Sequence, residues 1–146
     1  MPSVSESVDI AAAPDAAFGF VADAPARATM FIPGLNRIGN VTTETAGVDQ
    51  AWEYEFNWFG LVVIGQSRCT GYDRPSIYQF KTLTGNPSTW TYRFEPNGGG
   101  TRLTLDVDYE LPQNQLARFA TTGSLEQMNR NRAREIVANL KALIEP

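Results

Sequence analysis

The chain has 146 residues, and this length predicts one domain, residues 1–146, that can bury a core of its own. Hydrophobic residues make up 42% of it and charged residues 19%, as in ordinary globular domains. The net charge is −4 and basic residues form no run, which argues against a nucleic-acid partner and against attachment to an anionic membrane.

The chain has no histidine, and Cys69 is its one cysteine. This composition excludes an intrachain disulfide, a Ser–His or Cys–His nucleophile pair and most zinc sites. We therefore expect no metal and no cofactor, and any catalysis would use carboxylates, Tyr, Lys, Arg or bound water. The N-terminus lacks the apolar core of a signal peptide, and no apolar run is long enough to cross a bilayer. We expect a cytoplasmic protein without stable membrane insertion.

The N-terminal quarter predicts a strand and two short helices. Val4, Val8 and Ile10 alternate with polar residues, which indicates a strand despite Glu6 on the same face. A helix is expected from Pro14 and ends at 23–25, and a second short helix or turn is expected over 26–31.

A long β region follows, in which antiparallel hairpins are separated by Gly, Pro, Asn and Asp turns. Residues 61–72 predict a strand whose two faces have similar character, so its inward face is left open. The other strands are expected over 38–45, over 51–58, around 78–80, over 89–95 and over 102–109.

The last segment predicts one long helix over 124–144. Ser124 and Gln127 form a capping-box pattern, and the preceding Gly123 favours a kink or restart. At 100° per residue one side of this helix is apolar. The apolar side consists of Leu125, Ile136, Leu140 and Leu143, flanked by Ala133, Val137 and Ile144.

Asn129 interrupts the centre of this apolar stripe, Arg132 lies near its edge, and Met128 flanks Arg132. A polar group in such a place needs a protein partner, a water or a ligand. Two interpretations stay open: Asn129 bonds a backbone group at a sheet edge while Arg132 extends its charged end to solvent, or both residues face a ligand.

Together these elements predict an α+β fold in which a curved antiparallel sheet of about seven strands wraps around the C-terminal helix. One face of that sheet carries ten of the sixteen aromatic residues. Large rings around a partly unfilled space line small-molecule pockets, although the same rings also form solid cores. The ten are Trp52, Tyr54, Phe56, Trp58, Tyr78, Phe80, Trp90, Tyr92, Phe94 and Tyr109.

The order of elements resembles the START-like and Bet v 1-like helix-grip superfamily (SRPBCC), and within it the polyketide cyclase/dehydrase branch. The resemblance spans nearly the whole chain and implies a pocket between the sheet and the last helix. Its motifs are structural rather than catalytic, and the missing histidine excludes an iron oxygenase of this superfamily. Three stretches carry the resemblance: Ile10–Pro14 followed by Phe18, Val21 and Asp23; Phe94–Pro96 with Gly98–Thr104; and Leu140–Leu143. A fourth stretch, Phe31–Gly34, also resembles a branch of the superfamily that is associated with carbon monoxide dehydrogenase, the subunit-G branch.

Three functions remain open from the sequence. The first is binding of a small, largely apolar or aromatic molecule, lipid-like or polyketide-like, in a cavity between the sheet and the C-terminal helix, by a monomer or homodimer. The second is a metal-free polyketide cyclase or dehydratase, and the third is a protein-interaction or maturation factor. No catalytic residues can be assigned. The expected ligand-binding residues are Tyr54, Phe56, Trp58, Tyr78, Trp90, Tyr92, Tyr109, Phe119, Met128, Asn129 and Arg132.

Overall fold

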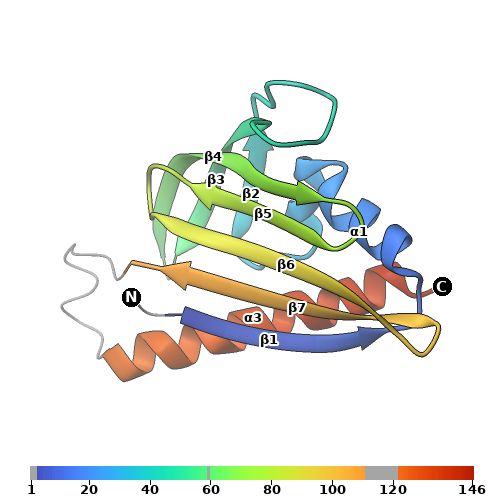
Figure 1. The fold of residues 1–146 in the computed structure, drawn as a ribbon. Helices are drawn as coiled ribbons and strands as arrows, with labels where there is room; N and C mark the ends of the chain where they lie inside the picture. The colour runs from blue at the N-terminus through green and yellow to red at the C-terminus, as the bar shows by residue number, and fades with distance from the viewer. Residues whose placement is uncertain (1–2, 59, 111–121) are drawn as a thin grey trace.

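A computed structural model describes residues 3–58, 60–110 and 122–146, without the side chains of residues 58 and 122–125. It contains the expected strands, two short helices after the first strand, and a long C-terminal helix (Figure 1). The elements are β1 (Ser3–Ile10), α1 (Pro14–Ala22), the 3-10 helix η1 (Pro25–Met30), β2 (Leu35–Gly39), β3 (Ala51–Trp58), β4 (Leu61–Asp73), β5 (Ile77–Thr82), β6 (Ser88–Asn97), β7 (Gly100–Tyr109) and α3 (Thr122–Ile144).

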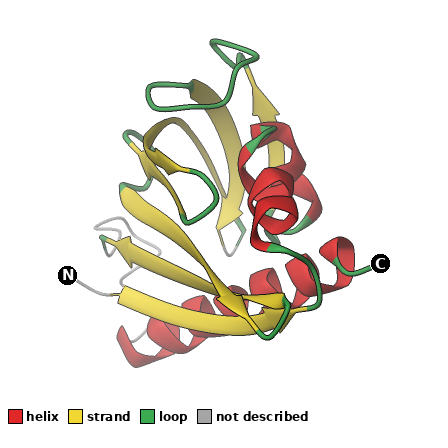
Figure 2. Cartoon of the chain, turned by 45° about the vertical axis from the view of Figure 1, so that its right-hand side comes forward, coloured by secondary structure: helices red, strands yellow, loops and turns green. Residues whose placement is uncertain are grey.

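The seven strands form one antiparallel sheet in the order β1-β7-β6-β5-β4-β3-β2. The sheet is strongly bent, and α3 runs along its β1 and β7 side, while α1 and η1 lie at the other side of the concave face (Figures 1 and 2). This confirms the expected α+β architecture. It also shows that α3 packs on one part of the sheet rather than across all of it.

Strand β2 begins and ends earlier than the expected 38–45. Asn40 has a φ of 50°, a left-handed conformation that ends an extended strand. At the other end Gly34 has a φ of 87°, and a Cβ there would lie 2.8 Å from the carbonyl oxygen of Asn57. Glycine therefore lets the chain pass close to β3 before β2 starts.

Strand β4 directs its smaller residues inward, which the sequence left undecided. Gly65, Ser67 and Cys69 are buried, whereas Val62 and Ile64 on the other face are 56% and 61% exposed. A Cβ at Gly65 would lie 2.7 Å from the Tyr54 hydroxyl oxygen. The Thr84 carbonyl and the Tyr54 hydroxyl therefore leave no room for a side chain at Gly65.

Helix α3 buries Ala133, Ile136, Val137 and Leu140 against the sheet. Leu143 was expected on the same stripe but is 40% exposed, whereas its neighbour Ile144 packs against the core. The Leu125 side chain and the capping box of Ser124 lie outside the described side chains. In the described part of the chain, no helix combines the length and apolar character needed to span a bilayer.

Polar contacts join the helix to the first strand along its length. Arg134 pairs with Glu6 at 2.9 Å, which explains how a carboxylate is accommodated on the inward-facing side of β1. Near the C-terminus the Lys141 ammonium donates to the Asp9 carbonyl at 2.7 Å, and the Ala11 amide donates to Glu145 at 2.7 Å. These contacts fix α3 along β1.

Leu140→Ala should lower the free energy of unfolding by about 2–5 kcal/mol, because it removes a fully buried side chain. Leu143→Ala, one turn further along, should change it by less than about 0.5 kcal/mol. Urea unfolding followed by circular dichroism measures both. Equal losses in the two variants would contradict the packing of α3 described above.

Candidate functional site

One hollow, called the inner hollow below, lies on the concave face over β2 to β6, under η1. Its cavity volume is about 80 Å³, several times the ~10–15 Å³ that a single water needs. None of its described lining residues carries a charge, and most are apolar or aromatic. They are Ala28, Ile32, Leu35, Ile38, Trp52, Tyr54, Phe56, Val63, Ser67, Phe80, Thr82, Asn86, Ser88 and Trp90.

A chain of hydrogen bonds crosses one wall of the inner hollow. The Trp90 indole N–H donates to Ser88 Oγ at 2.9 Å, Ser88 Oγ and Thr82 Oγ1 are 2.7 Å apart, and Thr82 Oγ1 donates to the Asn86 carbonyl at 2.6 Å. Since Thr82 has one hydroxyl hydrogen and directs it at Asn86, Ser88 donates to Thr82. Both hydroxyl hydrogens are then used, and each oxygen keeps one lone pair. The wall therefore offers acceptors to a guest molecule and holds Trp90 in place.

Tyr54 holds the loop that follows β5. Its hydroxyl donates to the Thr84 carbonyl at 2.7 Å and accepts from the Asn86 amide at 3.2 Å. Burial raises the pKa of the Tyr54 hydroxyl. A hydroxyl already committed to the loop, with a raised pKa, is suited to positioning rather than to proton transfer at neutral pH.

A second hollow, called the outer hollow below, lies between β6, β7, β1 and α3. Its cavity volume is about 60 Å³. It shares Phe56, Asn86, Ser88 and Trp90 with the inner hollow, so these residues separate two adjoining spaces. Its lining residues are Val4, Phe56, Asn86, Ser88, Trp90, Val107, Tyr109, Asn129, Arg132, Ala133 and Ile136.

Arg132 is the charged residue among the described lining of the outer hollow, and its guanidinium carbon lies 4.8 Å from the centre of the Phe56 ring. Burial lowers the pKa of the Arg132 guanidinium, and the charge of Glu135 partly offsets this effect. Arg132 also lines a shallow surface depression together with Met128 and Glu135. It therefore lies where the outer hollow meets the protein surface.

The structure divides the sequence-predicted site residues into four groups. Tyr54, Phe56 and Trp90 line the inner hollow; Phe56, Trp90, Tyr109, Asn129 and Arg132 line the outer one; and Met128, 39% exposed, lines the surface depression. Tyr78 and Tyr92 are buried in the packed core, where their rings stack on each other. The Trp58 side chain and Phe119 lie outside the described residues.

Sequence reasoning missed the polar wall and two rings of the inner hollow. Trp52 and Phe80 were placed on the aromatic face but not selected as site residues, and the alternation that identified their neighbours applies equally to them. Ser67, Thr82 and Ser88 gave no sequence signal, because their positions depend on strand pairing: Thr82 lies opposite Ser88 in the β5–β6 register.

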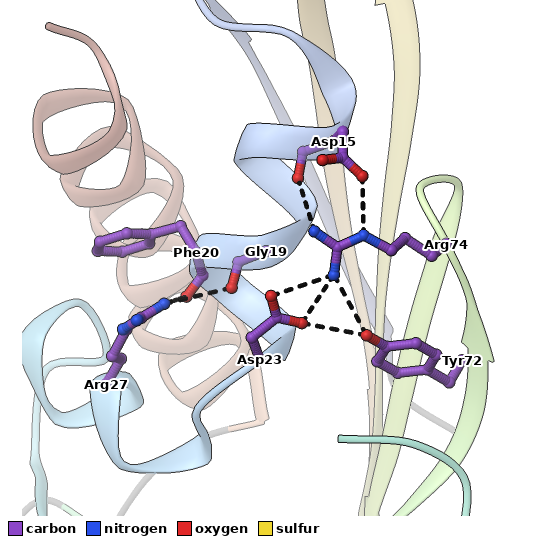
Figure 3. A network of polar contacts seen from close by, with 7 residues as sticks. All are labelled: Asp15, Gly19, Phe20, Asp23, Arg27, Tyr72 and Arg74. Atoms are coloured by element: carbon purple, nitrogen blue, oxygen red, sulfur yellow. Dashed lines mark hydrogen bonds and ion pairs between the residues drawn. The ribbon is translucent and has the colours of Figure 1, made fainter. Parts of the chain in front are cut away.

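A connected polar cluster lies elsewhere, where the β4–β5 turn meets α1 (Figure 3). Arg74 Nε contacts Asp15 and Arg74 Nη1 contacts Asp23, each at 2.8 Å, and Tyr72 donates to Asp23 at 3.0 Å. The Arg74 guanidinium also lies 5.4 Å from the ring centre of Phe18. These groups satisfy one another, so the cluster fastens α1 to the sheet rather than forming a binding site.

Among the described residues, no group of three or more His, Cys, Asp or Glu side chains could hold a metal ion. Cys69 is fully buried on β4, and burial raises the pKa of its thiol. A buried thiol of this kind is a packing residue rather than a nucleophile.

A bent sheet holding a C-terminal helix, with hollows between them, defines the helix-grip class of proteins. The chain belongs to the family described as polyketide cyclase/dehydrase and lipid transport, whose model matches residues 1–145. Among curated protein sequences none matches significantly.

Solved structures show the same fold. A START superfamily protein from Mycobacterium smegmatis superposes with a TM-score of 0.78 at 13% identity, covering 97% of this chain and 96% of that one. The Zhui aromatase/cyclase from Streptomyces sp. R1128 gives 0.77 at 17% identity, covering 98% and 93%. The major latex-like protein 151 of Panax ginseng gives 0.74 at 14% identity, covering 99% and 98%. At these identities the likeness concerns the fold alone.

Asp15→Asn tests the cluster at α1. Arg74 lowers the pKa of Asp15 below its ordinary value of 3.8, so the ion pair stabilises the fold above that pH and loses this effect as the pH falls through the lower folded-state value. The variant should have a lower urea midpoint than the wild type at pH 7, and the difference should shrink on acidification toward about pH 2.

Asp108→Asn is the matched control, because it removes an exposed carboxylate from β7 that contacts no basic group within the described ranges. Its urea midpoint should follow the wild type at both pH values. A difference between Asp15→Asn and wild type that stays constant from pH 7 to pH 2 would contradict the role of the ion pair.

Proposed function

We propose that the protein binds a small, largely apolar or aromatic molecule in the inner and outer hollows. The observation that carries the proposal is the inner hollow itself: a space larger than a water, bounded by rings and lined by uncharged residues. The family to which the chain belongs includes lipid transport in its description, which supports the same function.

The lining predicts how a guest is oriented. The rings of Trp52, Phe80 and Trp90 offer flat apolar contacts, with Phe80 stacked on Trp90 at 5.6 Å between ring centres. The oxygens of Ser88 and Thr82 offer acceptors. A guest with an apolar ring and a hydroxyl or N–H group can therefore pack against the aromatic rings and donate a hydrogen bond to these oxygens.

The volume of the hollows constrains the guest. Pockets for drug-sized ligands are typically about 300–1,000 Å³, whereas the two hollows measure about 80 and 60 Å³. A guest of more than one or two rings must therefore join them, and the side chains that separate them are Phe56 and Trp90. Rotation of Phe56 is the smaller change, since Trp90 is held by its bond to Ser88.

The metal-free cyclase or dehydratase alternative has less support. The titratable residues among the described lining of both hollows are Tyr54, Tyr109 and Arg132. Tyr54 is already committed to the loop after β5. A carboxylate facing either hollow would favour proton-transfer chemistry, and their described linings contain none.

The interaction-factor alternative has one observation in its favour. Val62 and Ile64 are exposed on the outer face of β4, and Leu83 nearby is also exposed. Scattered exposed aliphatic residues are common on protein surfaces, so this patch weighs less than the hollow. A cytoplasmic location and a monomeric or homodimeric state stay predictions.

Ala28→Leu tests the proposal by filling the inner hollow from η1. The neutral fluorophore N-phenyl-1-naphthylamine should bind the wild type, and Ala28→Leu should weaken that binding about tenfold, because the added carbons occupy the space of the guest. Fluorescence titration measures the dissociation constants. Native mass spectrometry of the purified protein should also reveal any retained small molecule.

Ala26→Leu is the matched control, since Ala26 lies on the same 3-10 helix but is exposed and lines neither hollow. Its affinity for the fluorophore should equal that of the wild type. The proposal fails if the wild type does not bind the fluorophore, or if Ala28→Leu and Ala26→Leu both bind it as tightly as the wild type does.

A further inference from the structure

The linings of the two hollows differ in charge. The inner hollow is lined by uncharged groups, whereas the outer hollow contains Arg132, at the point where it meets the surface depression. A guest that fills both spaces therefore meets uncharged groups at its inner end and the guanidinium of Arg132 at its outer end, where Glu135 lines the adjoining depression.

The position of Arg132 suits recognition of an oxyanion. The guanidinium carbon of Arg132 lies over the Phe56 ring, 4.8 Å from its centre, which is a cation–π contact. Arginine has five N–H donors arranged in a planar fork, and this fork matches carboxylate, sulfonate or phosphate oxygens.

Two neighbours supply further contacts. Asn129 lies three residues before Arg132 on α3, so both side chains project to the same side of the helix, and both line the outer hollow. Tyr109 of β7 lines the same space from the sheet. An amide and a phenol beside a guanidinium can complete the hydrogen bonding of an anionic group without adding a second charge.

We propose that Arg132, assisted by Asn129, binds the anionic group of the ligand, so that the ligand class is an apolar or aromatic acid with its body in the inner hollow. This inference rests on the proposed function. The partial burial of Arg132 strengthens it, because a half-buried guanidinium gains more from an oxyanion than an exposed one does.

The test uses two fluorophores with the same ring system. N-phenyl-1-naphthylamine is neutral, and 1-anilinonaphthalene-8-sulfonate adds one sulfonate. Arg132→Gln should weaken binding of the sulfonate about tenfold, as expected for loss of a charge-assisted hydrogen bond, and should weaken binding of the neutral probe by a much smaller factor. Arg132→Lys keeps the charge but not the planar fork, and should give an intermediate affinity for the sulfonate.

Arg130→Gln is the matched control, because it removes one positive charge from the same helix at an exposed position that lines neither hollow. It should bind both probes as the wild type does. Circular dichroism and urea midpoints of all variants identify any variant that does not fold. If Arg132→Gln does not fold, Arg132→Lys is used for the test in its place.

Competition experiments test the class of acid. The aromatic acid 2-naphthoate and the aliphatic acid decanoate are each added to displace the bound sulfonate probe, and displacement by either acid supports the inference.

The inference is overturned if Arg132→Gln weakens both probes equally, which would mean that Arg132 contributes packing alone. It is also overturned if Arg130→Gln weakens the sulfonate as much as Arg132→Gln does, or if neither acid competes. Failure of the proposed function gives a different result, in which the neutral probe does not bind the wild type.

Discussion

The structure depends on where α3 packs. Its buried residues Ala133, Ile136, Val137 and Leu140 lie against the β1 and β7 side of a strongly bent sheet, and the ion pair of Arg134 with Glu6 and the hydrogen bond of Lys141 to the Asp9 carbonyl hold it there. A helix about 10 Å wide cannot also cover the strands on the far side of the bend. The remaining concave face is covered by α1, by the short helix η1 and by rings from the strands. Rigid rings leave gaps where their shapes do not match, and the inner hollow is such a gap.

The polar groups around this gap are arranged so that the protein satisfies most of them internally. Tyr54 bonds the loop after β5, and Trp90, Ser88 and Thr82 form a directed chain that ends on a backbone carbonyl. The groups that face the hollow are therefore the remaining lone pairs of the hydroxyl oxygens and the apolar surfaces of the rings. Such a wall is stable without a bound guest, and it favours a guest that donates a hydrogen bond.

The sequence predicted most of the fold because period-2 alternation and turn residues are local signals. The aromatic alternation of β3 and β6 located the concave face, and the amphipathic pattern located α3. The inward face of β4 could not be predicted, since the Thr84 carbonyl and the Tyr54 hydroxyl that leave no room for a side chain at Gly65 come from distant parts of the chain. A helical stripe likewise does not specify which of two neighbouring apolar residues packs, and Leu143 is exposed whereas Ile144 contacts the core.

The site was predicted less completely than the fold, for a related reason. Rings that line a hollow and rings that fill a core follow the same alternation, so Tyr78 and Tyr92 were selected with Trp90 although they stack on each other in the packed core. The Thr82–Ser88 pair exists only through the register of β5 and β6. These features depend on long-range pairing, which local patterns do not contain.

The central claim is that a guest enters the interior rather than adhering to the exposed patch on β4. A two-dimensional ¹H–¹⁵N spectrum, recorded while N-phenyl-1-naphthylamine is added, tests it most directly. The account predicts saturable shifts of the Trp52 and Trp90 indole N–H signals, while the Val62 and Ile64 amide signals stay in place. Shifts at Val62 and Ile64 with unchanged indole signals would contradict it.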